Sequence, residues 1–237
     1  SGTADFVGVI WEGQCQNQEF SGTVTQLTMS GSTASSTAYK FCTTVSGASF
    51  RDNVNVQTNA LRYNSANGCG ILSTGASVSA VVPAESFCRI SKIQVASTGA
   101  SGRSVIANAG GSFFDYLICE GRDTGVTDSV GTARFINTET VRNSIFVLRA
   151  TGADHIIGTG TGSPMFYNCS VVAPDDLATA PTSIFLSGAS GTVTVQNCGL
   201  FAGDSTKAIK AGSATFNFTT CYSDISGTAG VTQTTYS

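Results

Sequence analysis

The residues of this sequence that could carry chemistry are 15 acidic side chains, a single histidine and eight cysteines. Two carboxylates that face each other across a groove, about 5–9.5 Å apart, can hydrolyse a glycosidic bond. In polysaccharide lyases, acidic residues instead bind a cation, and a basic residue beside them abstracts a proton. Three groups of acids stand close together in the sequence and are candidates for such sites: Asp115 with Glu120, Asp123 and Asp128; Asp175 with Asp176; and Asp154 beside His155.

The first two groups also have structural explanations. Asp115 alternates outward on a predicted strand, where Arg122 and Arg142 are candidate ion-pair partners. Asp175 and Asp176 lie in a loop flanked by prolines, and acids in such loops usually shape a turn or face solvent.

The third group contains the only histidine of the chain. Asp154 and His155 are neighbours on a predicted strand, so their side chains point to opposite faces. No GxSxG elbow marks a serine nucleophile, and the NTD, GDD, GHG and RIK signatures of pectinase-type hydrolases are absent. We therefore expect the acids to have structural roles and the chain not to be an enzyme.

The eight cysteines allow three kinds of role. Their even number permits disulfides, but a chain of 237 residues can bury enough surface to fold without them. A closed zinc site has no signature here, because no CxxC occurs and the chain holds one histidine. Free cysteine is also an ordinary small core residue. We expect reduced thiols, no metal site and no cofactor.

The elements that position these side chains follow from a six-residue pattern that recurs six times. Its copies are residues 90–95 (ISKIQV), 114–119 (FDYLIC), 141–146 (VRNSIF), 166–171 (FYNCSV), 195–200 (VQNCGL) and 218–223 (FTTCYS). Their first positions are 24, 27, 25, 29 and 23 residues apart. Such a period is typical of a solenoid, in which each repeat buries its apolar face by stacking on its neighbours.

The register inside the pattern indicates which solenoid this is. Positions one, four and six are apolar or small, and an asparagine at position three can adopt a left-handed conformation that turns the chain and restarts the alternation. Asparagines stacked at this turn could hydrogen-bond along the axis, and cysteines at position four would form an inward stack about 4.8 Å apart. The predicted core ladder is Asn143, Asn168, Asn197, Cys169, Cys198 and Cys221.

This register predicts an all-β, single-stranded right-handed parallel β-helix with rungs of about 23–29 residues. A second apolar strand follows a Gly-rich turn in each rung, at residues 105–106, 135–136, 156–157, 184–186, 208–209 and, more weakly, at Val231. Loops between strands, at residues 97–104, 121–131 and 173–182, are where a solenoid usually carries binding surfaces.

We expect a single domain over residues 1–237, with a possible N-terminal arm in 1–8, irregular first rungs and a cap in 9–77, and regular rungs in 78–237. Trp11 is either a lid over the first rung or an ordinary buried aromatic. The polar, Asn-rich stretch 48–68 is either a loop that leaves the solenoid or two irregular rungs.

Composition excludes other classes of protein. The net charge is −3, and the 12 basic residues are scattered, which argues against a nucleic-acid partner. No apolar run approaches the roughly 20 residues that a membrane span needs, and no signal-peptide core stands at the start. We expect a soluble, mature chain with no membrane partner.

The sequence resembles a known family of proteins. The block at residues 50–68, followed by six rungs with the Asn-Cys pattern, is similar to right-handed β-helix proteins of tailed bacteriophages and related prophages, over roughly residues 11–236. That family includes tailspike-like proteins and short trimeric proteins that sit on the outside of the icosahedral head. A chain this short, with no separate receptor-binding or chaperone-like domain, is more similar to the head-decoration type.

The resemblance implies a structural virion protein. The chain would be a decoration or cement protein on the outer surface of the capsid, a homotrimer whose partner is the major capsid protein. The alternative is a tailspike or carbohydrate-binding β-helix, with or without polysaccharide depolymerase activity. An exposed acidic pair in an aromatic-lined groove would favour the alternative, and a flat Thr/Ser-rich lateral face would favour decoration.

Overall fold

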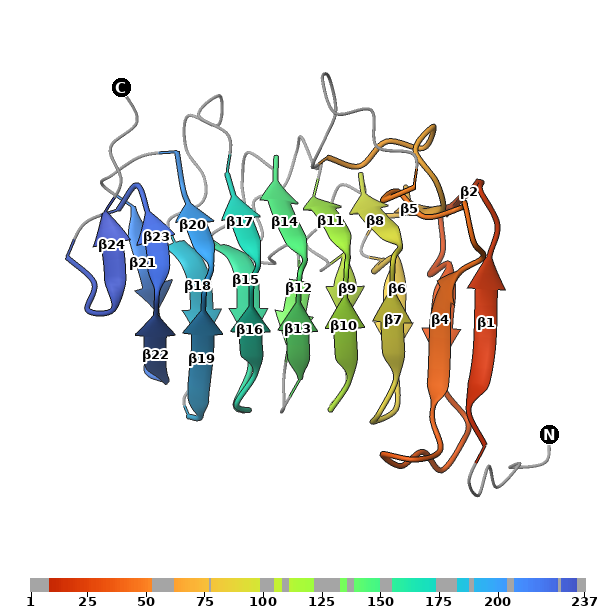
Figure 1. Cartoon of the computed structure of the whole chain (residues 1–237), viewed down its shortest axis with the longest axis horizontal. Coiled ribbons are helices and arrows are strands. Elements are labelled where there is room, and N and C mark those ends of the chain that lie inside the picture. The colour runs from red at the N-terminus through yellow and green to blue at the C-terminus, as the bar shows by residue number, and fades with distance from the viewer. Residues whose placement is uncertain are drawn as a thin grey trace.

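The chain forms a solenoid of parallel β-strands (Figure 1). The structure is a computed structural model that describes residues 9–52, 62–76, 78–98, 105–107, 111–121, 133–135, 139–149, 155–173, 183–187, 190–203, 207–225 and 227–233. All the described regular elements are strands, and every strand pair in the three sheets is parallel. This confirms the predicted all-β parallel β-helix.

The strands belong to three sheets that run the length of the solenoid. Sheet A has eight strands: β1 (Trp11–Cys15), β4 (Lys40–Thr44), β7 (Arg89–Ser91), β10 (Phe113–Asp115), β13 (Thr140–Arg142), β16 (Met165–Tyr167), β19 (Thr192–Gln196) and β22 (Thr215–Thr219). Sheet B has nine: β2 (Glu19–Gly22), β5 (Gly70–Ser73), β8 (Gln94–Ser97), β11 (Ile118–Gly121), β14 (Ile145–Leu148), β17 (Ser170–Val172), β20 (Gly199–Phe201), β23 (Cys221–Ser223) and β24 (Val231–Gln233). Sheet C has seven: β3 (Leu27–Met29), β6 (Val81–Pro83), β9 (Ile106–Ala107), β12 (Ala133–Phe135), β15 (His155–Thr159), β18 (Ser183–Ser187) and β21 (Ala208–Ala211).

The core is built from columns of residues in register. Phe114 of β10 lies opposite Ile90 of β7 on one side and Val141 of β13 on the other. All three side chains are fully buried, as are Phe166 and Val195 in the next two rungs. Each rung therefore buries its apolar face against the rungs above and below it, as the six-residue pattern predicts.

The corner between sheets A and B is a turn at the third position of the pattern. Asn143, Asn168 and Asn197 have φ of 50°, 53° and 54°, which is the left-handed conformation that the pattern predicts. The same conformation occurs at the equivalent positions that carry other residues: Lys92, Tyr116 and Thr220. The geometry of the corner is thus imposed by the fold, and among residues with a side chain asparagine adopts it at low cost.

The third sheet contains most of the predicted second strands. Strands β9, β12, β15, β18 and β21 cover five of the six predicted segments in whole or in part. Val231 also lies in a strand, β24 (Val231–Gln233), but this strand pairs with β23 and belongs to sheet B, not to sheet C. Only residues 224–230 separate these two strands, and so short a connection cannot pass through sheets C and A before it returns.

The first rungs are part of the same solenoid. Strands β1 to β5 extend the three sheets, and residues 62–67 lie on the outer face of sheet B before the chain re-enters the core at Cys69. There the backbone N–H of Tyr63 donates to the Glu120 carboxylate at 2.8 Å. For this part of the stretch, a loop that leaves the solenoid was the right alternative, while residues 53–61 lie outside the described residues. The described part of the chain holds no helix of the length and hydrophobicity that crossing a membrane requires.

Candidate functional site

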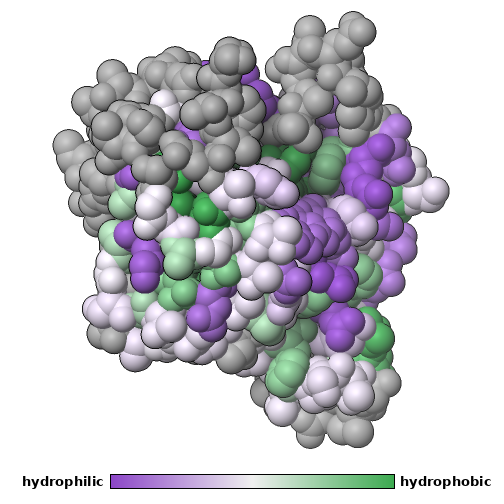
Figure 2. All heavy atoms as spheres, turned by 60° about the vertical axis from the view of Figure 1, so that its left-hand side comes forward, coloured by the Kyte–Doolittle hydropathy of each residue, from purple (hydrophilic) through white to green (hydrophobic). Residues whose placement is uncertain are grey.

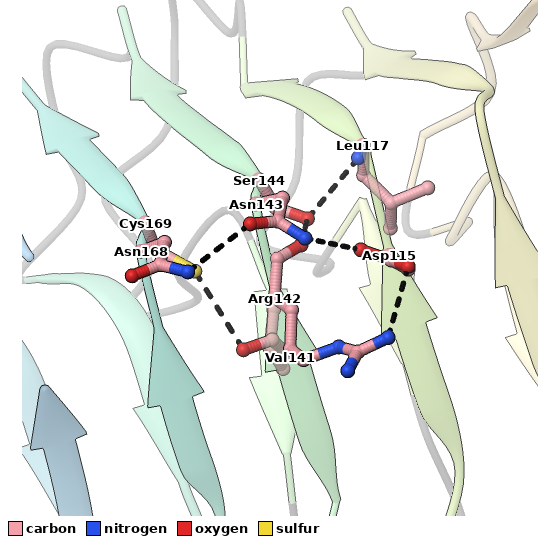
Figure 3. A network of polar contacts seen from close by, with 8 residues as sticks. All are labelled: Asp115, Leu117, Val141, Arg142, Asn143, Ser144, Asn168 and Cys169. Carbon is pink, nitrogen blue, oxygen red and sulfur yellow. Dashed lines mark hydrogen bonds and ion pairs between the residues drawn. The ribbon is translucent and has the colours of Figure 1, made fainter. Parts of the chain in front are cut away.

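The corner between sheets A and B carries a polar ladder (Figure 3). The Asn143 amide donates to one oxygen of the Asp115 carboxylate at 2.8 Å, and Arg142 Nη2 donates to the other at 3.2 Å. The Asn168 amide then donates to Asn143 Oδ1 at 3.3 Å. The ladder links three successive rungs along the solenoid axis, so the Asp115 carboxylate is already engaged by a cation and an amide.

Behind this ladder, the fourth position of the pattern faces inward. Cys169, Cys198 and Cys221 are buried, and each thiol donates to the carbonyl two residues earlier, at 3.3, 3.2 and 3.4 Å. Ser144 makes the same contact with the Arg142 carbonyl at 2.6 Å. A thiol or hydroxyl at this position therefore satisfies a carbonyl that the left-handed turn leaves beside the core, which accounts for the recurring Asn-Cys pair.

Two of the ladder thiols, Cys198 and Cys221, are poor nucleophiles. The hydrogen bond with Cys169 is the largest cause that raises the pKa of Cys198, and with burial it brings that pKa to about 12. The hydrogen bond with Cys198 and burial likewise raise the pKa of Cys221. The structure records all eight cysteines as free thiols. Protonated, buried thiols serve the core through packing and hydrogen bonds.

The outer face of sheet A is covered by stacked side chains. The Arg89 guanidinium lies 3.7 Å from the centroid of the Tyr39 ring, and the Arg142 guanidinium lies 4.5 Å from that of Phe113. The register neighbours of Asp115 on this face are Ser91 and Arg142. Asp115 therefore has a serine and an arginine beside it in the sheet, where two-carboxylate chemistry needs a second acid.

The other predicted acid groups are separated or lie elsewhere. Glu120 is on β11 in sheet B, fully buried beneath residues 62–67, so it does not join Asp115. His155 is buried in β15. No group of three or more His, Cys, Asp or Glu side chains in the described ranges is placed to hold a metal ion. The remaining residues of these groups lie outside the described residues: Arg122, Asp123, Asp128, Asp154, Asp175 and Asp176.

The N-terminal end of the solenoid exposes apolar surface. Of the seven large apolar side chains that are exposed in the described residues, five lie within residues 9–24. Val24 is 65% exposed and Trp11 is 51% exposed, with Val9 and Ile10 beside it in sequence. Both interpretations of Trp11 needed it buried, and both were wrong, because no described rung lies in front of β1. Contiguous exposed apolar residues at the open end of a sheet are typical of an interaction surface.

A cavity opens among the residues of this end. It has a volume of about 310 Å³, and its apolar lining comes from Trp11, Cys15, Leu27, Met29 and Cys42. The apolar core of the solenoid therefore reaches its first rung, where it contains a space that no described side chain fills.

The thiol of Cys15, at this cavity, differs from those of the ladder. Its sulfur lies 3.8 Å from that of Cys42. Hydrogen bonds from Cys42 and then Cys69 lower the pKa of Cys15 to about 4, against the opposing effect of burial. The same contact with Cys15, together with burial, raises the pKa of Cys42 and of Cys69. Ionisation of this cluster therefore falls on Cys15, the least buried of the three thiols.

The C-terminal end is better covered. Phe216 and Phe218 stack with ring centroids 5.7 Å apart, and both pack against the core together with Val231 of β24. Figure 2 brings this end forward and shows mostly pale or hydrophilic residues, with hydrophobic ones confined to small separate areas. The two ends of the solenoid therefore differ, and the apolar surface belongs to the first rung.

A partly buried ion pair connects two segments of the first rungs. Lys40 Nζ lies 2.9 Å from Glu85 Oε1, and the Ser32 hydroxyl donates to the same carboxylate at 2.6 Å. Burial raises the pKa of Glu85, but the hydrogen bonds from Ser32 and Lys40 outweigh it, so the net pKa lies below 4.5. The carboxylate is held ionised between two segments far apart in sequence.

Sequence reasoning did not identify this apolar end as a site. The signal was present in the consecutive apolar residues Val9, Ile10 and Trp11, which do not alternate with polar ones as a half-buried strand would. In comparisons with known proteins, no protein-family profile matches the chain, and no curated protein or solved structure shows significant similarity to it.

Proposed function

We propose that this chain is a structural virion protein of a tailed bacteriophage, a decoration or cement protein that binds the outer surface of the capsid as a homotrimer. The observation that carries this proposal is the uncovered apolar end at residues 9–24, with its open cavity. A solenoid with one adhesive end is suited to standing on a shell and contacting several of its subunits. The partner at that end is the major capsid protein.

The energetics favour burial of this end in an assembly. Fully burying a large apolar side chain contributes about 1.5–3 kcal/mol, so the exposed half of Trp11 alone is worth about 1 kcal/mol. Val9, Ile10 and Val24 are exposed to a similar or greater degree. Three copies in a trimer would present this surface together, and binding through linked sites is far stronger than through one.

The lateral surface supports a mechanical role. Asp115 is held by Arg142 and Asn143, and arginine side chains stack on Tyr39 and Phe113. These contacts connect one rung to the next, so they resist separation of the rungs. A cement protein adds contacts between shell subunits that oppose internal pressure, and it must itself resist deformation to do so.

The only tryptophan of the chain provides the test, because Trp11 lies in the proposed contact. Shells assembled from the cognate major capsid protein should co-sediment the chain and shift its tryptophan emission to shorter wavelength. Trp11→Ser should weaken co-sedimentation about tenfold or more, since it removes a central aromatic anchor. The matched control is Tyr222→Ser, which alters a residue 48% exposed on β23 at the other end.

The outcomes separate the alternatives. Loss of binding in Trp11→Ser, with binding kept in Tyr222→Ser, would support attachment through the N-terminal end. Equal binding of both variants would refute that attachment, and no co-sedimentation of the parent chain would refute the decoration role. The trimer is tested separately by light scattering, which should give three times the mass of one chain.

A further inference from the structure

The cavity at the first rung contains two thiols that touch. Cys15 is the last residue of β1 and Cys42 is the middle residue of β4, and both line the cavity. Their sulfur atoms lie 3.8 Å apart, so no atom separates them. The residue opposite Cys42 in the register is Gly13, which has no side chain and therefore leaves the space in front of Cys42 to the thiol of Cys15.

Strand β1 has room to move because it is the end strand of sheet A. It pairs with β4, and no other described strand lies along its second edge. The register partner of Cys15 is Thr44, so Cys15 and Cys42 are diagonal neighbours, and the Cα atoms of such neighbours lie about 7–8 Å apart. A disulfide spans slightly less, and its sulfur atoms are about 2.05 Å apart. A bridge therefore requires a shift of the end strand, in which the sulfur atoms approach by about 1.8 Å.

The pair carries one negative charge, which lies on Cys15. Hydrogen bonds from Cys42 and then Cys69 lower the pKa of Cys15 to about 4, against the opposing effect of burial. The hydrogen bond to Cys15 is also the largest cause that raises the pKa of Cys42, so the Cys42 thiol keeps its proton. At neutral pH a thiolate therefore faces a thiol, and the thiolate is the form of cysteine that reacts with oxidants.

Access distinguishes Cys15 from the other seven cysteines. Cys15 is partly exposed, and the others are all buried. Burial is the largest cause that raises the pKa of Cys119, and contacts within the ladder raise the pKa of Cys198 and of Cys221. Redox-sensitive cysteines combine a low pKa, access to solvent and an adjacent resolving thiol. Among the eight cysteines, Cys15 alone meets all three conditions.

We propose that Cys15 and Cys42 form an oxidation-sensitive thiol pair, in which Cys15 reacts with hydrogen peroxide and Cys42 resolves the product to a disulfide. In the first step the Cys15 sulfur attacks one oxygen of the peroxide. The S–O bond forms, the O–O bond breaks, and hydroxide leaves and is protonated to water. Cys15 is then a neutral sulfenic acid, so it no longer holds the proton of Cys42.

In the second step the Cys42 sulfur attacks the Cys15 sulfur. The S–S bond forms, the S–O bond breaks, and the departing hydroxide takes the Cys42 proton and leaves as water. Two thiols and one peroxide thus give one disulfide and two waters. The bridge ties β1 to β4 and fixes the first rung, and a small thiol such as dithiothreitol reverses it by exchange.

This chemistry does not depend on the capsid role. The cavity lies at the apolar end that the proposed function places against the shell, so the test uses the full chain free in solution. Failure of shell binding would leave its results unchanged, and the two proposals fail separately.

Trypsin separates the two cysteines, which allows a direct test. Cleavage after Lys40 and Arg51 leaves Cys15 as the only cysteine of residues 1–40 and Cys42 as the only cysteine of residues 41–51. After treatment of the chain with hydrogen peroxide at neutral pH, digestion without a reductant should yield these two peptides joined. Mass spectrometry should find the joined pair two hydrogen atoms lighter than the separate peptides. It should form about tenfold faster, or more, than the peptides that carry Cys119 and Cys198 are oxidised.

Serine variants assign the two roles. Cys15→Ser should abolish the joined peptides. Cys42→Ser should leave Cys15 as a sulfenic acid, which dimedone traps on residues 1–40. The matched control is Cys198→Ser in the ladder, where serine already occupies the equivalent position of another rung as Ser144. This control should form the joined peptides at the rate of the parent chain, and circular dichroism should show that every variant is folded.

Four results would overturn the proposal. The two peptides stay separate in the folded, oxidised chain; residues 1–40 join the peptide that carries Cys69 instead; the bridge occurs only between two chains, as a non-reducing gel would show; or the ladder cysteines are oxidised as fast as Cys15.

Discussion

Replacing Asn143 tests how the corner of the solenoid is stabilised. Asn143 contributes through its φ of 50°, which suits asparagine, and through its side chain, which donates to the Asp115 carboxylate at 2.8 Å and accepts from the Asn168 amide at 3.3 Å. Asn197 has nearly the same φ, 54°, and no side-chain hydrogen bond of its amide is found among the described residues. Glycine and alanine at both positions therefore separate the two contributions.

The magnitudes follow from these contacts. Alanine at a left-handed position costs about 1 kcal/mol more than glycine, so this difference should appear at both sites. A hydrogen bond to a carboxylate contributes about 1.5–3 kcal/mol when buried, and about 1 kcal/mol where Arg142 and solvent share the carboxylate. We expect Asn143→Gly to be less stable than Asn197→Gly by about 1 kcal/mol, and each alanine variant to lie about 1 kcal/mol below its glycine counterpart.

Urea unfolding followed by circular dichroism measures these differences. With a slope of about 3 kcal/mol per M, each step of 1 kcal/mol moves the midpoint by about 0.3 M. Equal stability of the alanine and glycine variants would refute the conformational argument. Equal stability of Asn143→Gly and Asn197→Gly would refute the contribution of the ladder hydrogen bond.

Three further predictions concern other residues. Thr220 is a β-branched residue with φ of 54°, so Thr220→Asn should raise the free energy of unfolding by about 0.5–1 kcal/mol and with it the urea midpoint. A lower midpoint would contradict the conformational argument for the corner. The hydrogen bond from Cys42 lowers the pKa of Cys15, so iodoacetamide should modify Cys15 before the other thiols at about pH 6, at a rate nearly constant up to about pH 8. Peptide mass spectrometry measures the rate at which Cys15 is modified. A rate that rises about tenfold per pH unit, as for an ordinary thiol, would contradict the prediction. The pKa of Glu85 in the folded chain lies below 4.5, so its ionised carboxylate stabilises the fold above that pH, and this contribution is lost as the pH falls through the folded pKa. Glu85→Gln should therefore be less stable than the parent chain at about pH 7. The difference in stability between the two should narrow by about pH 3. A difference independent of pH would show that Lys40 does not stabilise the carboxylate.

The solenoid was predictable because its pattern is local and repeated. Position three of the pattern fixes a turn, and the inward positions follow from alternation alone, so the columns through Phe114 and Phe166 needed no knowledge of distant residues. Val231 lies in a strand as predicted, but periodicity does not reveal that residues 224–230 are too few to carry the chain through sheets C and A, so that β24 joins sheet B.

The candidate sites depend on contacts between segments far apart in sequence. Glu120 reads as an exposed acid beside Asp115, yet it is covered by a loop that begins more than 50 residues earlier. Cys15 and Cys42 are 27 positions apart, and nothing in their local sequence indicates that their thiols touch. Trp11 is exposed because no described rung precedes β1, a property of the end of the array that a repeat pattern does not encode.

The most direct test of the decoration role is the copy number of this chain in purified particles, measured by quantitative mass spectrometry against the major capsid protein. The proposal predicts a number of copies comparable to that of the shell protein. A handful of copies per particle would contradict it and favour a tailspike-like protein instead.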